Sequence, residues 1–145
     1  MTEETAAPRV RQLRLVVRAD DYDAALTFFR DVVGLPEREA YSADGGAEVT
    51  ILEAGVATLE IANRAQVEFI DRVETDGHHS PALRVAFEVD DTATMTATLV
   101  DGGAELIASP RVTPWRSLNA RVAAPEGVEI TIFQELGPLS PSAVE

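Results

Sequence analysis

The sequence predicts an α+β fold made of two tandem βαβββ modules, whose curved mixed sheets surround a cleft. Two observations support this prediction. Landmark residues of the first half recur in the second half at a constant offset of 70 positions: Leu13-Arg14, Asp20-Asp21 and Asp31 return as Leu83-Arg84, Asp90-Asp91 and Asp101. Each half also shows the same order of apolar segments, one strand-like, one helix-like and three more strand-like. A repeat of this kind indicates a duplicated structural unit.

The first module is expected at residues 10–63. It begins with an apolar strand at 13–19, after which Asp21 is suited to cap the start of a helix. Gly34 is suited to end that helix, and the residues between are apolar at helical spacing: Tyr22, Ala25, Leu26, Phe29, Val32 and Val33. Three strands should follow at 37–42, 48–53 and 56–62, because Gly-containing turns separate these segments.

The second module is expected at residues 83–136 and repeats this order. A strand at 83–89 leads to Asp91, which should cap a Thr-rich helix that stops at Gly102-Gly103. Threonine is a weak helix former, so packing must hold this helix in place. Strands are expected at 105–109, 118–124 and 128–134. Residues 64–82 should form a polar connection between the modules, and residues 137–145 a flexible tail.

Composition narrows the class of partner. The 145 residues carry a net charge of −13 and contain no cysteine. An acidic protein repels phosphate backbones and anionic lipid surfaces, so neither nucleic acid nor membrane is an expected partner. Without cysteine there can be no disulfide, thiolate nucleophile or zinc–sulfur site. The first eight residues lack the basic and apolar regions of a secretory signal, which favours a cytoplasmic location.

Alternation along the strands predicts which side chains line the cleft. Apolar residues should face the two helices, which leaves polar residues on the opposite face. On this basis we expect the cleft to contain Arg14, Arg18, Glu60, Arg84, Glu88, Asn119, Arg121, Thr131 and Phe133. Trp115, the only tryptophan, could form an aromatic wall for a flat ligand or simply cover the edge of the core. The same polar residues could also be a solvated outer face.

Two segments resemble a known superfamily. LRLVVRADDYDAALTFFRDVVGLPE in the first half, and LRVAFEVDD with TPWRSLNARVAAPEGVEITIFQ in the second, look like the vicinal oxygen chelate proteins. This superfamily contains glyoxalases, bleomycin-resistance proteins and extradiol dioxygenases. The resemblance covers about residues 10–136 and implies the duplicated fold. It also implies a homodimer, because such proteins often pair modules across a two-fold axis.

The resemblance further implies four metal-ligand positions, which fall on Arg14, Glu60, Arg84 and Thr131. Only Glu60 could bind a divalent ion, because arginine is cationic and has no acceptor atom. We therefore expect no metal and no other cofactor. The only histidines, His78 and His79, lie in the connection, where a solvated loop pair is the ordinary interpretation and a displaced metal ligand the alternative.

Three functional hypotheses follow. The first is a metal-independent protein of the glyoxalase/bleomycin-resistance type that binds a small organic molecule, with arginine forks holding a carboxylate or similar anion. The second is an enzyme of this fold, a lyase, isomerase or dioxygenase-like protein, that uses Glu60 as its catalytic base. The third is an ordinary metal-dependent enzyme, which the replaced ligands disfavour. As an alternative to any binding or catalytic role, Arg14, Glu60 and Arg84 could form a structural ion-pair cluster in which they bind only one another.

Overall fold

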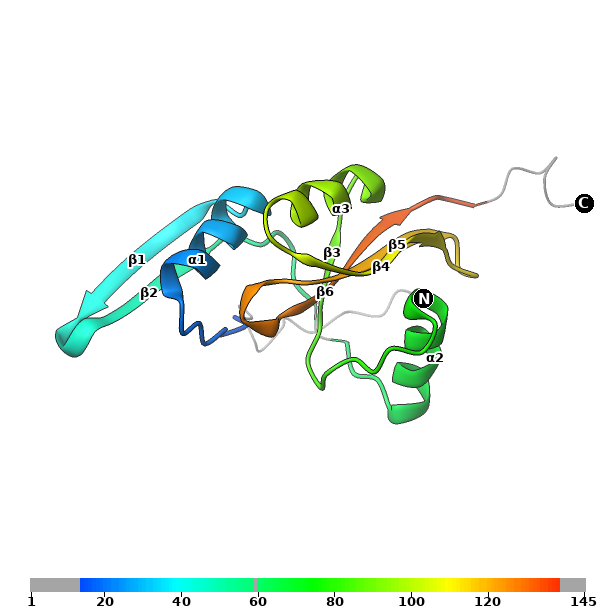
Figure 1. The fold of residues 1–145 in the computed structure, drawn as a ribbon, viewed down its shortest axis with the longest axis horizontal. Helices are drawn as coiled ribbons and strands as arrows, with labels where there is room; N and C mark the ends of the chain where they lie inside the picture. The colour runs from blue at the N-terminus through cyan, green and yellow to red at the C-terminus, as the bar shows by residue number, and fades with distance from the viewer. Residues whose placement is uncertain (1–13, 59, 139–145) are drawn as a thin grey trace, which may run out of the picture.

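Two separate sheets and three α-helices form the α+β fold that the computed structural model describes for residues 14–58 and 60–138 (Figure 1). The second module holds a four-stranded sheet in the order β3-β6-β5-β4. Its strands are β3 (Val85–Glu88), β4 (Glu105–Val112), β5 (Ser117–Ala123) and β6 (Glu129–Glu135). β3 pairs in parallel with β6, and the other neighbours are antiparallel. The predicted βαβββ order of the second module is confirmed.

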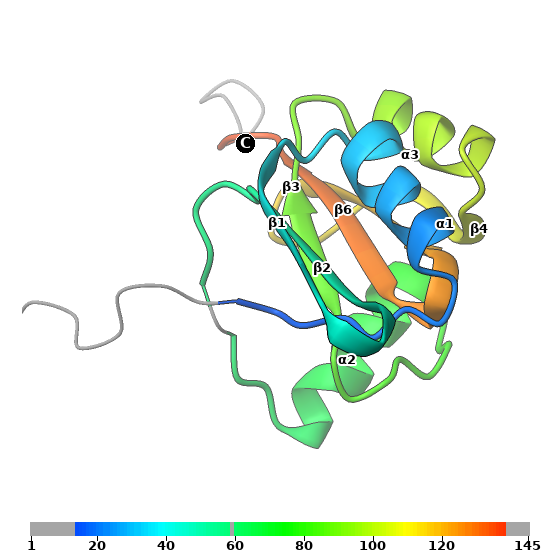
Figure 2. The same cartoon turned by 90° about the vertical axis from the view of Figure 1, so that its left-hand side faces the viewer.

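The core lies between this sheet and α3 (Thr92–Asp101). Leu99 of α3 is fully buried against alternate residues of β5 and β6, among them Val122, Ile130 and Ile132. Because these strand residues face α3, their neighbours along each strand must face the other side of the sheet. α3 and α2 (Arg64–Thr75) lie on opposite sides of the four strands (Figure 2).

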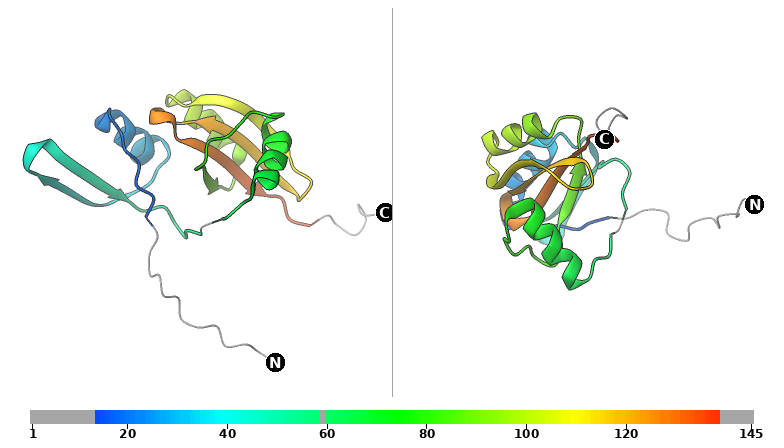
Figure 3. Two further views of the ribbon diagram at one scale, coloured as in Figure 1. Left: turned by 90° about the horizontal axis from the view of Figure 1, so that it is seen from below. Right: turned by 90° about the vertical axis from the view of Figure 1, so that its right-hand side faces the viewer.

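The first module is less complete than the sequence predicts. α1 (Tyr22–Leu26) continues into a π-helix at Thr27–Val32, and β1 (Glu37–Ala43) pairs with β2 (Ala47–Leu52) in an antiparallel hairpin. The hairpin projects away from the rest of the molecule in two orthogonal views (Figures 1 and 3). A 3-10 turn at Asp44–Gly46 joins its strands.

The two outer strands expected in the first module are not formed, and that prediction was wrong. Residues 14–19, 56–58 and 60–62 have no strand pairing, while residues 13 and 59 lie outside the described ranges. The side chains of Val16, Val56 and Ile61 are 87%, 98% and 84% exposed. An extended segment becomes a strand only when a neighbour satisfies its backbone groups. Within the described part of this chain, neither segment has such a neighbour.

A helix, α2, occupies part of the connection at residues 64–82, where we expected no regular structure. α2 spans Arg64–Thr75, and the side chain of Asn63 caps it by accepting a hydrogen bond from the Gln66 amide at 2.9 Å. Asp76, in the left-handed conformation at φ 59°, ends the helix. α2 lies against the face of the second sheet opposite α3 (Figure 2). Within the described ranges, no helix is long and apolar enough to cross a membrane.

Candidate functional site

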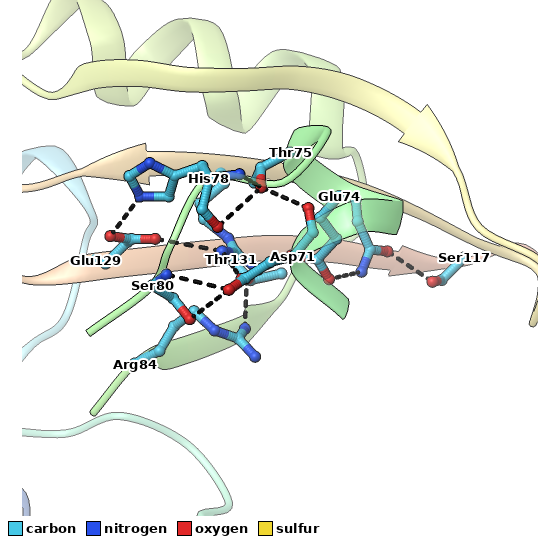
Figure 4. A network of polar contacts seen from close by, with 11 residues as sticks. Asp71, Glu74, Thr75, His78, Ser80, Arg84, Ser117, Glu129 and Thr131 are labelled. Carbon is cyan, nitrogen blue, oxygen red and sulfur yellow. Dashed lines mark hydrogen bonds and ion pairs between the residues drawn. The ribbon is translucent and has the colours of Figure 1, made fainter. Parts of the chain in front are cut away.

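A buried polar cluster lies between α2 and the second sheet (Figure 4). The sheet contributes alternate residues of β5 and β6 that point away from α3, namely Ser117, Asn119, Arg121, Glu129 and Thr131, each less than 9% exposed. Arg121 and Thr131 are direct neighbours in the strand register. The helix contributes Asp71 and Glu74, its two buried residues. Strand alternation thus places a row of polar side chains under one helix.

Arg121 is at the centre of this cluster and is fully buried, with 0% of its side chain exposed. Its Nη1 donates to Asp71 Oδ1 at 2.6 Å and to Glu129 Oε1 at 3.3 Å. Its Nη2 donates to Glu74 Oε1 at 2.8 Å. Burial alone lowers the pKa of Arg121, but the hydrogen bonds and charges of Asp71 and Glu74 outweigh it and raise the pKa above the ordinary value. The guanidinium therefore stays charged inside the protein.

The carboxylate of Glu74 receives hydrogen bonds on both oxygens. Thr131 Oγ1 and Arg121 donate to Oε1, at 2.9 and 2.8 Å, and Asn119 Nδ2 donates to Oε2 at 2.7 Å. Asn119 is itself oriented by Ser117, whose hydroxyl donates to Asn119 Oδ1 at 2.6 Å. Three donors from two strands thus form a preorganised carboxylate-binding arrangement.

Asp71 is bound differently, by the sheet and by the segment that follows the helix. The backbone amide and the hydroxyl of Ser80 both donate to Asp71 Oδ2 at 3.1 Å. Burial raises the pKa of Asp71, but the hydrogen bonds from Arg121 and Ser80 lower it by more, so the pKa lies below the ordinary value of 3.8. Asp71 is therefore an anion at neutral pH.

Two further groups extend the cluster at its edges. Arg84 Nη1 donates to Thr131 Oγ1 at 2.6 Å. The Thr131 hydroxyl thus bridges this second guanidinium and the carboxylate of Glu74. The ring Nε2 of His78 lies 3.2 Å from Glu129 Oε2. Both groups are closer to solvent than Arg121, because His78 is partly exposed and Arg84 is half-buried.

The structure brings some of the expected site residues together and leaves others apart. Arg84, Asn119, Arg121 and Thr131 meet in the cluster. The residues that lie outside it are Arg14, Arg18, Glu60 and Glu88, all exposed, and Phe133, half-buried beside Glu88 in the strand register. In the described part of the chain, no hydrogen bond or ion pair joins Arg14 to Glu60 or either of them to Arg84. Arg18 pairs with Asp20 instead, at 3.4 Å.

Trp115 lies against α2. Its ring centroid lies 6.0 Å from that of Phe69 on α2, and the residue is 43% exposed. Sequence reasoning missed the helix side of the cluster, because it treated the connection as polar loop. Asp71 and Glu74 are three residues apart, the spacing at which two side chains share a helix face, and this was the available signal.

The donors at the implied metal positions do not fit a divalent ion. Arg84 is a cation without an acceptor atom, and the hydroxyl of Thr131 is already bonded to Arg84 and Glu74. In residues 14–58 and 60–138, no group of three or more His, Cys, Asp or Glu side chains is arranged to hold a metal ion. We derive no chemical step through a metal.

A separate hollow of about 370 Å³ lies in the first module, between α1 and the β1–β2 hairpin. Its lining includes Tyr22, Tyr41 and the carboxylates of Asp23, Glu37 and Glu48. These carboxylates are exposed, whereas the cluster under α2 has buried and mutually oriented donors. Preorganisation distinguishes a binding site from a surface hollow, so we regard the cluster as the candidate site.

Comparison with known proteins agrees with this architecture. The profile of the Glyoxalase/Bleomycin resistance protein/Dioxygenase superfamily matches residues 11–132. A glyoxalase family protein from Bacillus cereus has 21% identity and a TM-score of 0.59, over 91% of this chain and 100% of that one. A glyoxalase-related enzyme from Fulvimarina pelagi has 17% identity and a TM-score of 0.54, over 91% and 94%.

A third similar structure is a superfamily member from Sphaerobacter thermophilus, with 17% identity and a TM-score of 0.55 over 83% of this chain and 92% of that one. No curated protein sequence matches the chain. At such identities the structures show the fold alone.

The strand–helix–three-strand module defines this protein as one of the class built from βαβββ units. The chain belongs to the Glyoxalase/Bleomycin resistance protein/Dioxygenase superfamily.

Proposed function

We propose that the protein binds a small organic anion, without a metal, on the face of the second sheet that carries Arg121. The observation that supports this most directly is the Glu74 carboxylate, which receives hydrogen bonds from Arg121, Asn119 and Thr131. The donors that bind the carboxylate of Glu74 are also suited to bind the carboxylate of a ligand in its place. Arg84, bonded to Thr131, adds a second positive charge next to these donors.

The proposal can be tested by calorimetric titration of the purified protein with small mono- and dicarboxylates, at constant ionic strength. We expect saturable binding to the wild type and at least about tenfold weaker binding to Arg84→Gln, because that variant removes the second positive charge. Arg38→Gln is the matched control, since Arg38 is exposed and pairs with Glu53 in the first module. Equal affinities for both variants would contradict the assignment of Arg84.

Metal independence is part of the same proposal. We expect elemental analysis of the purified protein to find no stoichiometric transition metal, and a chelator to leave carboxylate binding unchanged. Stoichiometric metal that is lost together with binding would contradict the proposal.

We further propose a cytoplasmic location, which cell fractionation followed by immunodetection would test.

We also propose that the protein is a homodimer. The sheet of the first module has two strands, whereas the sheet of the second module has four. Apolar residues before α1 and after β2 are exposed, including Leu15, Val16, Val56 and Ile61. Covering such a surface with a second copy removes apolar area from water. Light scattering should give twice the mass of one chain, and Val16→Glu should give the monomer mass.

We still predict that Arg14 and Glu60 take part in the site, but within the dimer. There the first module of a second copy would face the cluster. Arg14→Gln should then weaken carboxylate binding in the dimer. An unchanged affinity would place Arg14 outside the site.

A further inference from the structure

α2 is attached to the sheet mainly by charged groups. The buried residues of the helix are Asp71 and Glu74, whereas Val67, Ile70 and Val73 are only half-buried and Phe69 is 39% exposed. A helix that belongs permanently to a core normally buries an apolar stripe. Here two carboxylates hold the helix over a polar sheet face, so breaking a few polar contacts would release it.

Glu74 occupies the place that a bound carboxylate would take. Its two oxygens use one nitrogen of Arg121, the amide of Asn119 and the hydroxyl of Thr131. These donors belong to the sheet, and strand pairing between β5 and β6 fixes the backbones that carry them. The helix therefore places a carboxylate among donors that all come from the sheet.

The fit of α2 to this site is incomplete in two respects. The Nε of Arg121 is buried without a hydrogen-bond partner. With α2 in place, the carboxylates of Asp71, Glu74 and Glu129 outnumber the guanidiniums of Arg84 and Arg121 by one charge. Without α2, the guanidiniums outnumber the single remaining carboxylate of Glu129 by one. The sheet face alone thus carries a net positive charge that suits an anion. Docking of α2 makes the net charge of the cluster negative.

We propose that α2 is a displaceable lid whose Glu74 occupies the carboxylate site, so that ligand binding and α2 docking exclude one another. This inference rests on the proposed function and adds to it a means of control. The affinity that a ligand shows then depends on the fraction of molecules in which α2 is undocked. Weakening the attachment of α2 must raise that affinity.

The chain contains a built-in reporter of the lid. Trp115, the only tryptophan, is in contact with Phe69 of α2. Release of the helix exposes the indole to water, which shifts and weakens its fluorescence. Amide hydrogen exchange in residues 64–75 reports the same event at the backbone.

The experiment titrates succinate, with sodium chloride as the ionic-strength control, into the full-length wild type and two lid variants, Glu74→Gln and Asp71→Asn. Each variant removes one negative charge from the underside of α2 without changing side-chain volume. We expect each to bind succinate about tenfold more tightly than the wild type. In the wild type, succinate should shift Trp115 emission and accelerate exchange in α2.

Glu68→Gln is the matched control, because Glu68 is an exposed carboxylate of the same helix and carries the same charge. It should bind succinate with wild-type affinity. Having two lid variants keeps the test decisive if one of them does not fold, which circular dichroism would reveal.

The possible outcomes separate the two proposals. If the wild type binds succinate and both lid variants bind no more tightly, the lid is overturned while the binding function stands. If the variants bind more tightly but Trp115 emission and α2 exchange do not respond to succinate, the gain is one of charge alone and the lid is overturned. If no form binds any carboxylate, the binding function fails and the lid fails with it.

Discussion

Arg121 of β5 donates a 2.6 Å hydrogen bond to Asp71 of α2, and this contact joins residues 50 positions apart in the sequence. Both side chains are buried. An ion pair withdrawn from water is stabilising only while both partners are present, because either one alone is an uncompensated buried charge. The docking of α2 therefore depends on the charges of both Arg121 and Asp71.

Replacing Arg121 should be among the most damaging single changes in the second module. Arg121→Met would leave the carboxylates of Asp71, Glu74 and Glu129 facing one another, and we expect it to lower the free energy of unfolding by about 3–5 kcal/mol. Urea unfolding measures this loss. Arg111→Met is the control, since the Arg111–Asp76 pair is exposed and should contribute at most about 1 kcal/mol. Similar losses in both variants would contradict the buried role of Arg121.

Stability should depend on the protonation of Asp71. Its pKa in the folded protein lies below the ordinary value of 3.8, since hydrogen bonds from Arg121 and Ser80 outweigh the effect of burial. A lowered carboxyl pKa stabilises the fold fully above the unfolded pKa, and that stabilisation is lost as the pH falls through the folded pKa. The loss should therefore begin near pH 4 and continue downward.

Asp71→Asn tests this pH dependence. We expect the variant to be less stable than the wild type by about 1–3 kcal/mol near pH 7 and the difference to shrink below about pH 4. Denaturant titrations at a series of pH values measure both curves. Asp101→Asn, which removes an exposed carboxylate, should keep the slope of the wild type. A difference that stays constant down to pH 2 would show that Asp71 does not titrate with folding.

The starts of α1 and α3 and much of the second module could be predicted from the sequence, because their signals are local. The two Asp pairs illustrate this: Asp21 accepts the Ala24 amide at 3.1 Å and Asp91 accepts the Thr94 amide at 3.0 Å, the caps expected from the repeat. Strand alternation likewise placed Asn119 and Arg121 on the side away from α3. A cap or a face depends on a few neighbouring residues, so a single sequence is sufficient to infer it.

The parts that could not be predicted depend on distant partners. Periodicity shows which residues of 13–19 and 56–62 share a face, but not whether a neighbouring strand is available within the same chain. α2 escaped notice for another reason. Its buried face carries Asp71 and Glu74, while pattern recognition looks for apolar residues on a buried face. The carboxylates make sense only once Arg121 is known to lie beneath them.

Gly102 controls how closely α3 approaches the helix of the first module. A Cβ at this position would overlap Cγ1 of Val32, although the backbone conformation of Gly102 is open to other residues. We expect Gly102→Ala to destabilise the protein by about 1–3 kcal/mol through overpacking. Thermal or urea unfolding measures the effect.

The partner variant Val32→Ala identifies the cause. If the overlap with Val32 is responsible, Gly102→Ala should lose most of its effect in the Val32→Ala background, and the double-mutant cycle should show clear coupling. Strictly additive losses would mean that the alanine acts on α3 alone.

The two helix caps allow a comparison in which each Asp pair provides its own control. Asp91→Ala removes the acceptor for the Thr94 amide and should lower stability by about 1 kcal/mol, and Asp21→Ala should do the same through the Ala24 amide. Asp90→Ala and Asp20→Ala remove equal charges one residue earlier, where no cap is formed, and should change stability by less than about 0.5 kcal/mol. Urea unfolding of the four variants measures these differences.

Because α3 is rich in threonine, a weak helix former, it should depend on its cap at least as strongly as α1 does. Equal losses for both members of a pair would mean that net charge, rather than the cap, determines the effect.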